Sequence, residues 1–219
     1  MKTHCLLSSL LIILCFSSCK NKATVFPSIL EIIGDERISA EKLKLIPGSP
    51  VDIYQWENHW VMYGLFRDLP EVKRKIKETC PEATIKWYDQ PFYVFDRKNC
   101  TNKKTAKEWS HTIMTANLVA DTILQEQYMD YHRLQAELFP EVAQGFCNAG
   151  FQQLLVFHNE RQLMLVISIP QGENLDDLNP KTTENNPRVD EWNVLMAQYQ
   201  EGIEGAAPGE TWVIFKPFR

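Results

Sequence analysis

The sequence predicts an α+β fold, in which an antiparallel sheet carries helices on one face. The composition is that of an ordinary folded protein, because 44% of the 219 residues are hydrophobic and 23% are charged. Stretches rich in β-branched and aromatic residues alternate with a few windows of helical periodicity. Beyond a leader, both halves of the chain show the order strand, helix, strand, strand.

Residues 1–18 have the features of a lipoprotein signal peptide. Lys2 precedes an apolar stretch over residues 6–16, and two serines stand directly before Cys19. Small residues before a cysteine permit cleavage there, so that Cys19 becomes the N-terminus that carries the lipid. An ordinary signal peptide is the alternative, whereas a membrane-spanning helix needs about 20 apolar residues. We therefore expect an exported protein, anchored by lipid to a membrane and facing the periplasm or the cell surface.

After the leader, residues 19–50 are predicted to be a tether, which ends in the turn cluster Pro47-Gly48-Ser49-Pro50. Residues 51–108 are then expected to form an N-terminal β-α-β-β unit. Strands are predicted at residues 51–54 and 60–66 before the helix at residues 71–79, and at residues 84–88 and 92–96 after it, and the β-α-β-β order runs from the strand at residues 60–66.

Residues 109–219 show the same order. Strands are predicted at residues 111–119, 151–157, 162–169 and 212–218, with a helical stretch at about residues 124–147, interrupted or kinked at Pro140, and a helix from Pro187 to about residue 200. The β-α-β-β order is typical of a ferredoxin-like fold. We expect such a sheet, and the repeated order allows two ferredoxin-like units in one chain.

Charge and motifs exclude several classes of function. The formal net charge of −5 opposes a nucleic-acid partner, because phosphate neutralisation needs clustered Lys and Arg. The chain has no Gly-rich phosphate loop, nucleophile elbow or metal-ligand pattern, so we expect neither a cofactor nor a metal. Beyond Cys19, the odd set of Cys80, Cys100 and Cys147 allows one disulfide and leaves its pairing open.

Two side chains suited to acid–base chemistry share a face of the long helical stretch. Tyr128 and His132 are four residues apart, one helical turn, and Tyr131 lies near the same face. A histidine titrates near neutral pH, and a phenol can donate a hydrogen bond to an oxygen, so together they suit proton transfer on a small ligand. From spacing alone, the alternative is that the pair only borders a core.

Four segments together resemble the L-rhamnose mutarotase family. They are residues 127–133 (QYMDYHR), Phe139-Pro140-Glu141-Val142 continuing to Gly150 and Phe151, residues 186–192 (NPRVDEW) with Met196, and residues 209–213 (GETWV). The match covers about residues 110–219. It implies a ferredoxin-like α+β fold of the dimeric α+β barrel type, which dimerises through its sheets and interconverts the α and β anomers of a 6-deoxy-hexose without a cofactor.

The resemblance also implies roles for individual residues. His132 matches the family's proton-transferring histidine and Tyr128 its substrate-side tyrosine, with Tyr131 a further candidate contact. Trp192 matches the first of two tandem tryptophans that wall the sugar, although its spacing from Val189 and Met196 also fits a core position. The second tryptophan is replaced by Asn193, which puts the identity of the sugar, L-rhamnose or L-fucose, in doubt.

Two questions stay open at the level of sequence. The function is either a mutarotase or a non-catalytic sugar-binding lipoprotein that has kept the pocket; a related oxygenase lacks a haem or flavin signature. The assembly is either a homodimer or an internal pseudo-dimer, in which the N-terminal unit stands in for the partner subunit.

Overall fold

The computed structural model describes residues 25–34, 38–46 and 51–218, and the chain over this part contains two ferredoxin-like units. The first unit has the order β-α-β-β-α-β, and its sheet has the antiparallel strand order β4-β1-β3-β2. Its elements are β1 (Ser28–Ile33), α1 (Ala40–Lys44), β2 (Val51–Trp56), β3 (His59–Gly64), α2 (Leu69–Thr79) and β4 (Thr84–Tyr88).

The second unit repeats this plan with a richer helical layer. Its sheet order β10-β6-β8-β7 corresponds strand for strand to that of the first unit, and the short β9 (Gln200–Glu201) pairs with β6. Its other elements are β6 (Trp109–Leu118), α3 (Thr122–Arg133), α4 (Gln135–Leu138), α5 (Pro140–Asn148), β7 (Gln153–Asn159), β8 (Gln162–Pro170), α6 (Leu175–Leu178), the 3-10 turn η2 (Asn179–Thr182), α7 (Pro187–Ala197) and β10 (Val213–Pro217). The predicted ferredoxin-like α+β fold is confirmed, in two copies.

Two strands lie where the sequence did not place them. Strand β1 falls within residues 19–50, which were expected to be a tether, yet it lies between β4 and β3 in the first sheet. Strand β5 (Tyr93–Asp96), expected in the N-terminal unit, instead pairs with β7 at the edge of the second sheet. The complete first unit therefore runs from β1 to β4, and the chain then crosses to the second sheet.

The expected long helix is broken twice. Asp121 caps α3 by accepting hydrogen bonds from the backbone N–H groups of Ile123 and Leu124, and the helix ends at Arg133. The single turn of α4 follows, and Pro140 then occupies the first turn of α5, where its missing N–H costs nothing. Gln135, the first residue of α4, is buried.

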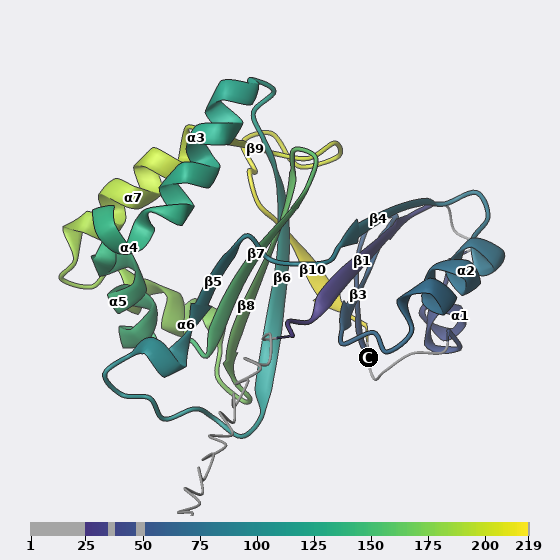
Figure 1. Cartoon of the computed structure of the whole chain (residues 1–219), viewed down its shortest axis with the longest axis horizontal. Helices are drawn as coiled ribbons and strands as arrows, with labels where there is room; N and C mark the ends of the chain where they lie inside the picture. Colours follow the sequence, from purple (N-terminus) through teal and green to yellow (C-terminus); the bar gives the residue numbers. More distant parts are fainter. Residues whose placement is uncertain (1–24, 35–37, 47–50, 219) are drawn as a thin grey trace, which may run out of the picture.

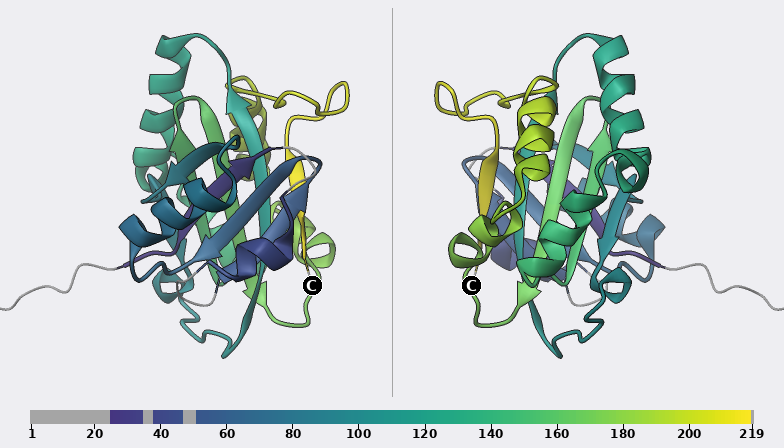
Figure 2. Two further views of the ribbon diagram at one scale, coloured as in Figure 1. Left: turned by 90° about the vertical axis from the view of Figure 1, so that its right-hand side faces the viewer. Right: turned by 90° about the vertical axis from the view of Figure 1, so that its left-hand side faces the viewer.

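The molecule has four layers, helix, sheet, sheet and helix (Figure 1). Helices α1 and α2 cover the outer face of the first sheet, and the helices of the second unit cover the outer face of the second sheet. Figure 2 shows each helical layer face-on, from opposite sides of the molecule. One apolar core fills each helix–sheet interface, and a third lies between the sheets, with Val61 and Tyr63 on one side and Leu155 and Met164 on the other.

Strand pairing and buried hydrogen bonds also connect the two sheets. Strand β10 pairs with β2 through Lys216 and Pro217, which joins the two sheets into one ten-stranded sheet. The carboxylate of Glu31 on β1 is fully buried and accepts hydrogen bonds from Tyr88 Oη at 3.0 Å and from Gln162 Nε2, on the second sheet, at 3.2 Å. The first unit is thus packed against the second through the inner faces of the two sheets.

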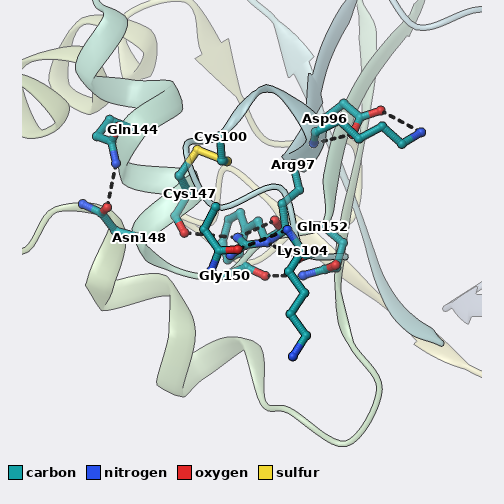
Figure 3. Close-up of a disulfide and its surroundings, with 12 residues drawn as sticks. Asp96, Arg97, Cys100, Lys104, Gln144, Cys147, Asn148, Gly150 and Gln152 are labelled. Carbon is teal, nitrogen blue, oxygen red and sulfur yellow. Dashed lines mark hydrogen bonds and ion pairs between the residues drawn. A yellow bond between two sulfur atoms is a disulfide. The ribbon is translucent and has the colours of Figure 1, made fainter. Parts of the chain in front are cut away.

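A disulfide ties the segment after β5 to the helical layer (Figure 3). Cys100 and Cys147, at the end of α5, are bonded with their Cα atoms 5.8 Å apart. Beside them the buried guanidinium of Arg97 donates to the backbone oxygens of Lys104 and Cys147, at 2.9 and 3.2 Å. Of the pairings left open by the sequence, this is the one formed, and Cys80 lies elsewhere, at the end of α2.

The leader and Cys19 lie outside the described residues. Within residues 25–34, 38–46 and 51–218, none of the helices combines the length and apolar character needed to cross a membrane.

Candidate active site

Tyr128 and His132 lie on the inner face of α3 and line a cavity of about 390 Å³ between the second sheet and its helices. The sheet supplies an apolar floor of Leu154, Val156, Leu165 and Ile167. The helices, the loops and the strands β5 and β9 supply the walls and the polar groups, which are Tyr93, Tyr128, His132, Gln135, Asn179, Trp192, Asn193, Gln200, Thr211 and Trp212. A volume of this size suits a small molecule.

The imidazole of His132 is held in one orientation. Its Nδ1 lies 3.0 Å from the backbone oxygen of Tyr128, one turn earlier, so in the neutral ring Nδ1 carries the proton and donates it to that carbonyl. Burial lowers the pKa of His132 to about 4, although the hydrogen bond to Tyr128 opposes this shift. The ring is therefore neutral at pH 7, and Nε2 carries a lone pair that can accept a proton.

The phenol of Tyr128 is buried beside this imidazole, with the two ring centroids 4.3 Å apart. Burial raises the pKa of Tyr128 above its usual range, so the hydroxyl keeps its proton. Gln200 Nε2 donates to the hydroxyl oxygen at 3.2 Å, and Gln200 is itself held by Trp212 Nε1 at 3.0 Å. The proton of Tyr128 thus remains available to a ligand, next to the base.

Aromatic rings enclose the imidazole on several sides. Phe92, Tyr93 and Trp192 each approach His132 edge-on, with centroid distances of 5.5, 5.2 and 5.1 Å. Trp192 also packs on Phe139 at 5.3 Å and is 6% exposed. The two roles weighed for Trp192 therefore coincide, because it is a core residue and a wall of the cavity at once.

The other predicted site residues are placed differently. Asn193 is exposed and lines the cavity at its rim, where the resemblance had placed a second tryptophan. Tyr131 packs on Tyr199, with centroids 5.9 Å apart, and is not among the residues that line the cavity. The structure therefore brings Tyr128, His132, Trp192 and Asn193 together and leaves Tyr131 outside.

Sequence reasoning missed the amides that complete the site. Gln200 and Gln135 both line the cavity, and Gln135 accepts a hydrogen bond from Tyr93 Oη at 2.7 Å. Trp212 lies within the segment 209–213 that carries the family resemblance, and Gln200 lies four residues after Met196 of another, so their position was a usable signal. Gln135 lies near the helix face of Tyr128 and His132, two residues after the segment 127–133, whereas Tyr93 lies 42 residues before Gln135 and carries no such signal.

A second, larger cavity of about 770 Å³ lies between the ends of the two sheets. Its lining includes His59, Lys86 and Gln162, and His59 Nδ1 lies 2.7 Å from the buried carboxylate of Glu31. It holds neither Tyr128 nor His132. Over the described ranges, no group of three or more His, Cys, Asp or Glu side chains is placed to bind a metal ion.

The fold and the smaller cavity define a class: a ferredoxin-like protein with an acid–base pair in an aromatic-walled pocket. The family model for L-rhamnose mutarotase matches residues 111–218. An L-fucose mutarotase of Xanthomonas campestris pv. campestris is 32% identical over 93 residues, which are 42% of this chain and 72% of that protein. A Dictyostelium discoideum protein is 29% identical over 104 residues, 44% of this chain and 77% of its own length. The chain belongs to the L-rhamnose mutarotase family.

Solved structures of similar shape include two Listeria proteins. One is an uncharacterised ferredoxin-fold protein from Listeria monocytogenes related to antibiotic biosynthesis monooxygenases, with 10% identity and a TM-score of 0.45 over 90% of this chain and 96% of that one. The other is a monooxygenase-like protein from Listeria innocua, with 12% identity and a TM-score of 0.42 over 88% of this chain and 94% of that one.

Proposed function

We propose that this protein interconverts the α and β anomers of a 6-deoxy-hexopyranose such as L-rhamnose or L-fucose. The observation that carries the proposal is the pairing of a neutral imidazole with a protonated phenol in one enclosed cavity. Mutarotation needs one group that takes the proton of the anomeric hydroxyl and one that donates a proton to the ring oxygen.

In the first step, His132 Nε2 removes the proton of the anomeric hydroxyl while Tyr128 Oη delivers its proton to the ring oxygen. The bond between the anomeric carbon and the ring oxygen breaks, which leaves an open-chain aldehyde with a free hydroxyl. His132 is then an imidazolium and Tyr128 a phenolate, and their close packing lets the two charges offset one another.

In the second step, the aldehyde turns about the bond to the next carbon and presents its other face. The ring hydroxyl adds to it and returns its proton to Tyr128, while His132 protonates the new anomeric oxygen. Both side chains end in their starting states, so the cycle consumes neither protons nor electrons. Enclosure by aromatic rings keeps the open-chain form oriented for closure.

The cavity also supports the class of sugar. A 6-deoxy-hexose has one methyl group and several hydroxyls, and the floor formed by Leu154, Val156, Leu165 and Ile167 offers an apolar surface to the methyl. The amide of Gln200 and the side chains of Asn179 and Asn193 offer hydrogen bonds to the hydroxyls. The names of the family model and of the Xanthomonas relative both refer to 6-deoxy sugars.

Saturation-transfer NMR on the chain lacking residues 1–19 tests the proposal directly. Added protein should speed exchange between the anomers of L-rhamnose or L-fucose, and His132→Gln and Tyr128→Phe should each lower the exchange rate by about 10²-fold or more. His158→Gln, an exposed histidine outside the cavity, and Tyr131→Phe are matched controls that should keep the wild-type rate.

If the wild type leaves the exchange of both sugars at the buffer rate, the proposed mutarotase activity is contradicted. If the sugars still bind in that case, the protein is the non-catalytic sugar-binding alternative.

We further propose that the protein is exported and lipid-anchored at Cys19. The disulfide between Cys100 and Cys147 supports this, because structural disulfides are typical of oxidising compartments. Metabolic labelling with a fatty acid should mark the wild type in the membrane fraction, whereas Cys19→Ala should be unlabelled. Equal labelling of both proteins would contradict the anchor.

A further inference from the structure

Gln135 is a buried amide whose hydrogen bonds are half satisfied. The side chain is 3% exposed and lines the cavity that holds Tyr128 and His132. Its Oε1 accepts a hydrogen bond from Tyr93 Oη at 2.7 Å, whereas its Nε2 has no hydrogen-bond partner among the described residues. Buried polar groups in folded proteins nearly always have a partner, so this exception requires an explanation.

The bond to Tyr93 determines which end of the amide is unpaired. Burial raises the pKa of Tyr93 to about 12, so its hydroxyl is protonated at neutral pH and acts as the donor. In the structure the amide oxygen of Gln135 is the atom that faces the Tyr93 hydroxyl, and the NH₂ group is the end without a partner. The missing partner is a hydrogen-bond acceptor.

The position of this donor is close to the reacting groups. Gln135 follows His132 by three residues, across the break between α3 and α4. Tyr93, which holds the amide, also packs edge-on against the imidazole of His132 at 5.2 Å. One phenol therefore contacts both the proposed base and the amide.

We propose that Gln135 is a specificity-determining residue that donates a hydrogen bond from Nε2 to an oxygen of the sugar, and that Tyr93 is the positioning residue for its amide. This inference rests on the proposed function, because it concerns the same cavity. The ligand class it selects is a sugar that bears a hydroxyl where the amide lies. A sugar without that oxygen leaves the donor unpaired and is bound less well.

With this role, Tyr93 makes the N-terminal part of the chain contribute to substrate specificity. Tyr93 lies on β5, before the segment that matches the family model, and β5 is held at the edge of the second sheet by pairing with β7. The disulfide at Cys100 and the buried Arg97 fix the chain that follows β5 (Figure 3). The family segment alone therefore lacks one wall of this pocket.

Four variants separate the amide from the scaffold. Gln135→Leu keeps the size of the side chain and removes the donor, and Tyr93→Phe removes only the hydroxyl that orients the amide. Gln127→Leu, exposed on α3, and Tyr131→Phe, outside the cavity, are the matched controls. Anomer exchange is measured by saturation-transfer NMR over a concentration series of L-rhamnose, of L-fucose, and of the 2-deoxy and 4-deoxy analogues of the better substrate.

We expect Gln135→Leu to raise KM for the better substrate by about 10-fold, with kcat within about 3-fold of wild type, and to reduce the preference between the two sugars by a similar factor. Tyr93→Phe should change the same quantities in the same direction by a smaller factor. One deoxy analogue should lose affinity with the wild type but show no further loss with Gln135→Leu, which identifies the recognised hydroxyl.

The role of Gln135 would be overturned if the wild type is active and both Gln135→Leu and Tyr93→Phe keep its KM and sugar preference. The proposed mutarotase activity would still stand in that case. If the wild type itself fails to speed exchange, the proposed reaction fails, and the same variants are compared through the dissociation constants of the two sugars from NMR titration. If Gln135→Leu does not fold, the result for Tyr93→Phe decides, because that change removes a single atom.

Discussion

The reactivity of His132 depends on its surroundings more than on its residue type. Its packing among Phe92, Tyr93 and Trp192 removes much of the ring from water, which disfavours the charged form, and the carbonyl of Tyr128 fixes which nitrogen carries the proton. A free histidine would be half-protonated near pH 6.5. In this site the ring is available as a base at every pH above about 4.

The pH dependence of catalysis follows from this shift. Since the pKa of His132 is lowered to about 4, kcat/KM should stay level from about pH 8 to pH 5 and fall only as pH approaches 4. The check is anomer exchange across this range, after subtraction of the buffer rate. An acid limb centred near pH 6.5 would show that the ring is not buried in the active form.

The lowered pKa of His132 should also make the free energy of unfolding depend on pH. Between pH 6.5 and pH 4 the unfolded chain protonates at His132 and the folded chain does not, so folding loses free energy as pH falls through this window. The free energy of unfolding measured with urea should therefore fall more steeply with decreasing pH for the wild type than for His132→Gln. Parallel pH profiles for the two proteins would contradict a lowered pKa.

Single residues differ in how far sequence can reveal them. Tyr128 and His132 could be found because both lie on one helix, where a spacing of four puts side chains on the same face. Tyr93 and Gln135 meet only after β5 has paired with β7 and the helix has broken after Arg133. A contact made by tertiary structure alone leaves no local pattern in the chain.

Strands also differ in how well the sequence predicts them. The positions of β4 and of the hairpin β7–β8 were anticipated from β-branched residues and turn signals. Strand β1 was not, because Leu30 packs toward the helices and Ile29 toward the other sheet. Burial on both faces produces a short, mostly apolar run, here interrupted by the buried Glu31, rather than an alternation, and a short run of that kind is ambiguous.

The disulfide should contribute measurably to the stability of the second unit. It closes a sequence separation of 47 residues, and such a crosslink is typically worth about 2–4 kcal/mol. The double variant Cys100→Ser, Cys147→Ser should unfold at a lower urea concentration than the oxidised wild type. Treatment of the wild type with dithiothreitol should give nearly the same midpoint as the double variant, and no shift in either would contradict the crosslink.

The contact between α5 and the η2 turn leaves no room for a side chain at Gly145. A Cβ atom there would clash with the backbone oxygen of Thr182, and backbone cannot move aside as cheaply as a side chain. Gly145→Ala should therefore destabilise the protein by about 1–3 kcal/mol in chemical unfolding, despite alanine's better helix propensity. Gln144→Ala, on the exposed side of the same helix, is the control and should change stability far less.

At the scale of the whole molecule, the first unit occupies the face through which a sheet-to-sheet dimer would form. The core between the sheets is apolar and closed, and the buried carboxylate of Glu31 joins residues from both units. The ferredoxin-like plan of each half was predicted, whereas the docking of one half on the other could be proposed only as an internal pseudo-dimer. Sequence does not record which surfaces meet.

Light scattering on the chain without residues 1–19 tests the internal pseudo-dimer. We expect the mass of one chain at micromolar concentration, because the inter-sheet face is already buried within the molecule. A stable dimer of twice that mass, with the second sheets of two chains in contact, would contradict this arrangement. The same sample should keep its anomer exchange rate per chain on dilution.

The interface between the two sheets lies within one chain, so it is free of a constraint that two-fold symmetry imposes on a dimer interface. In a symmetric dimer each interface substitution appears twice, on both subunits, so the surface must remain complementary to itself. Here the two faces are encoded by different stretches of one gene, and each can change separately while the other compensates. Helix α1 follows the first strand of its unit as α3 does, and it contains neither a tyrosine nor a histidine, so selection can act on the first unit for docking without preserving an acid–base pair.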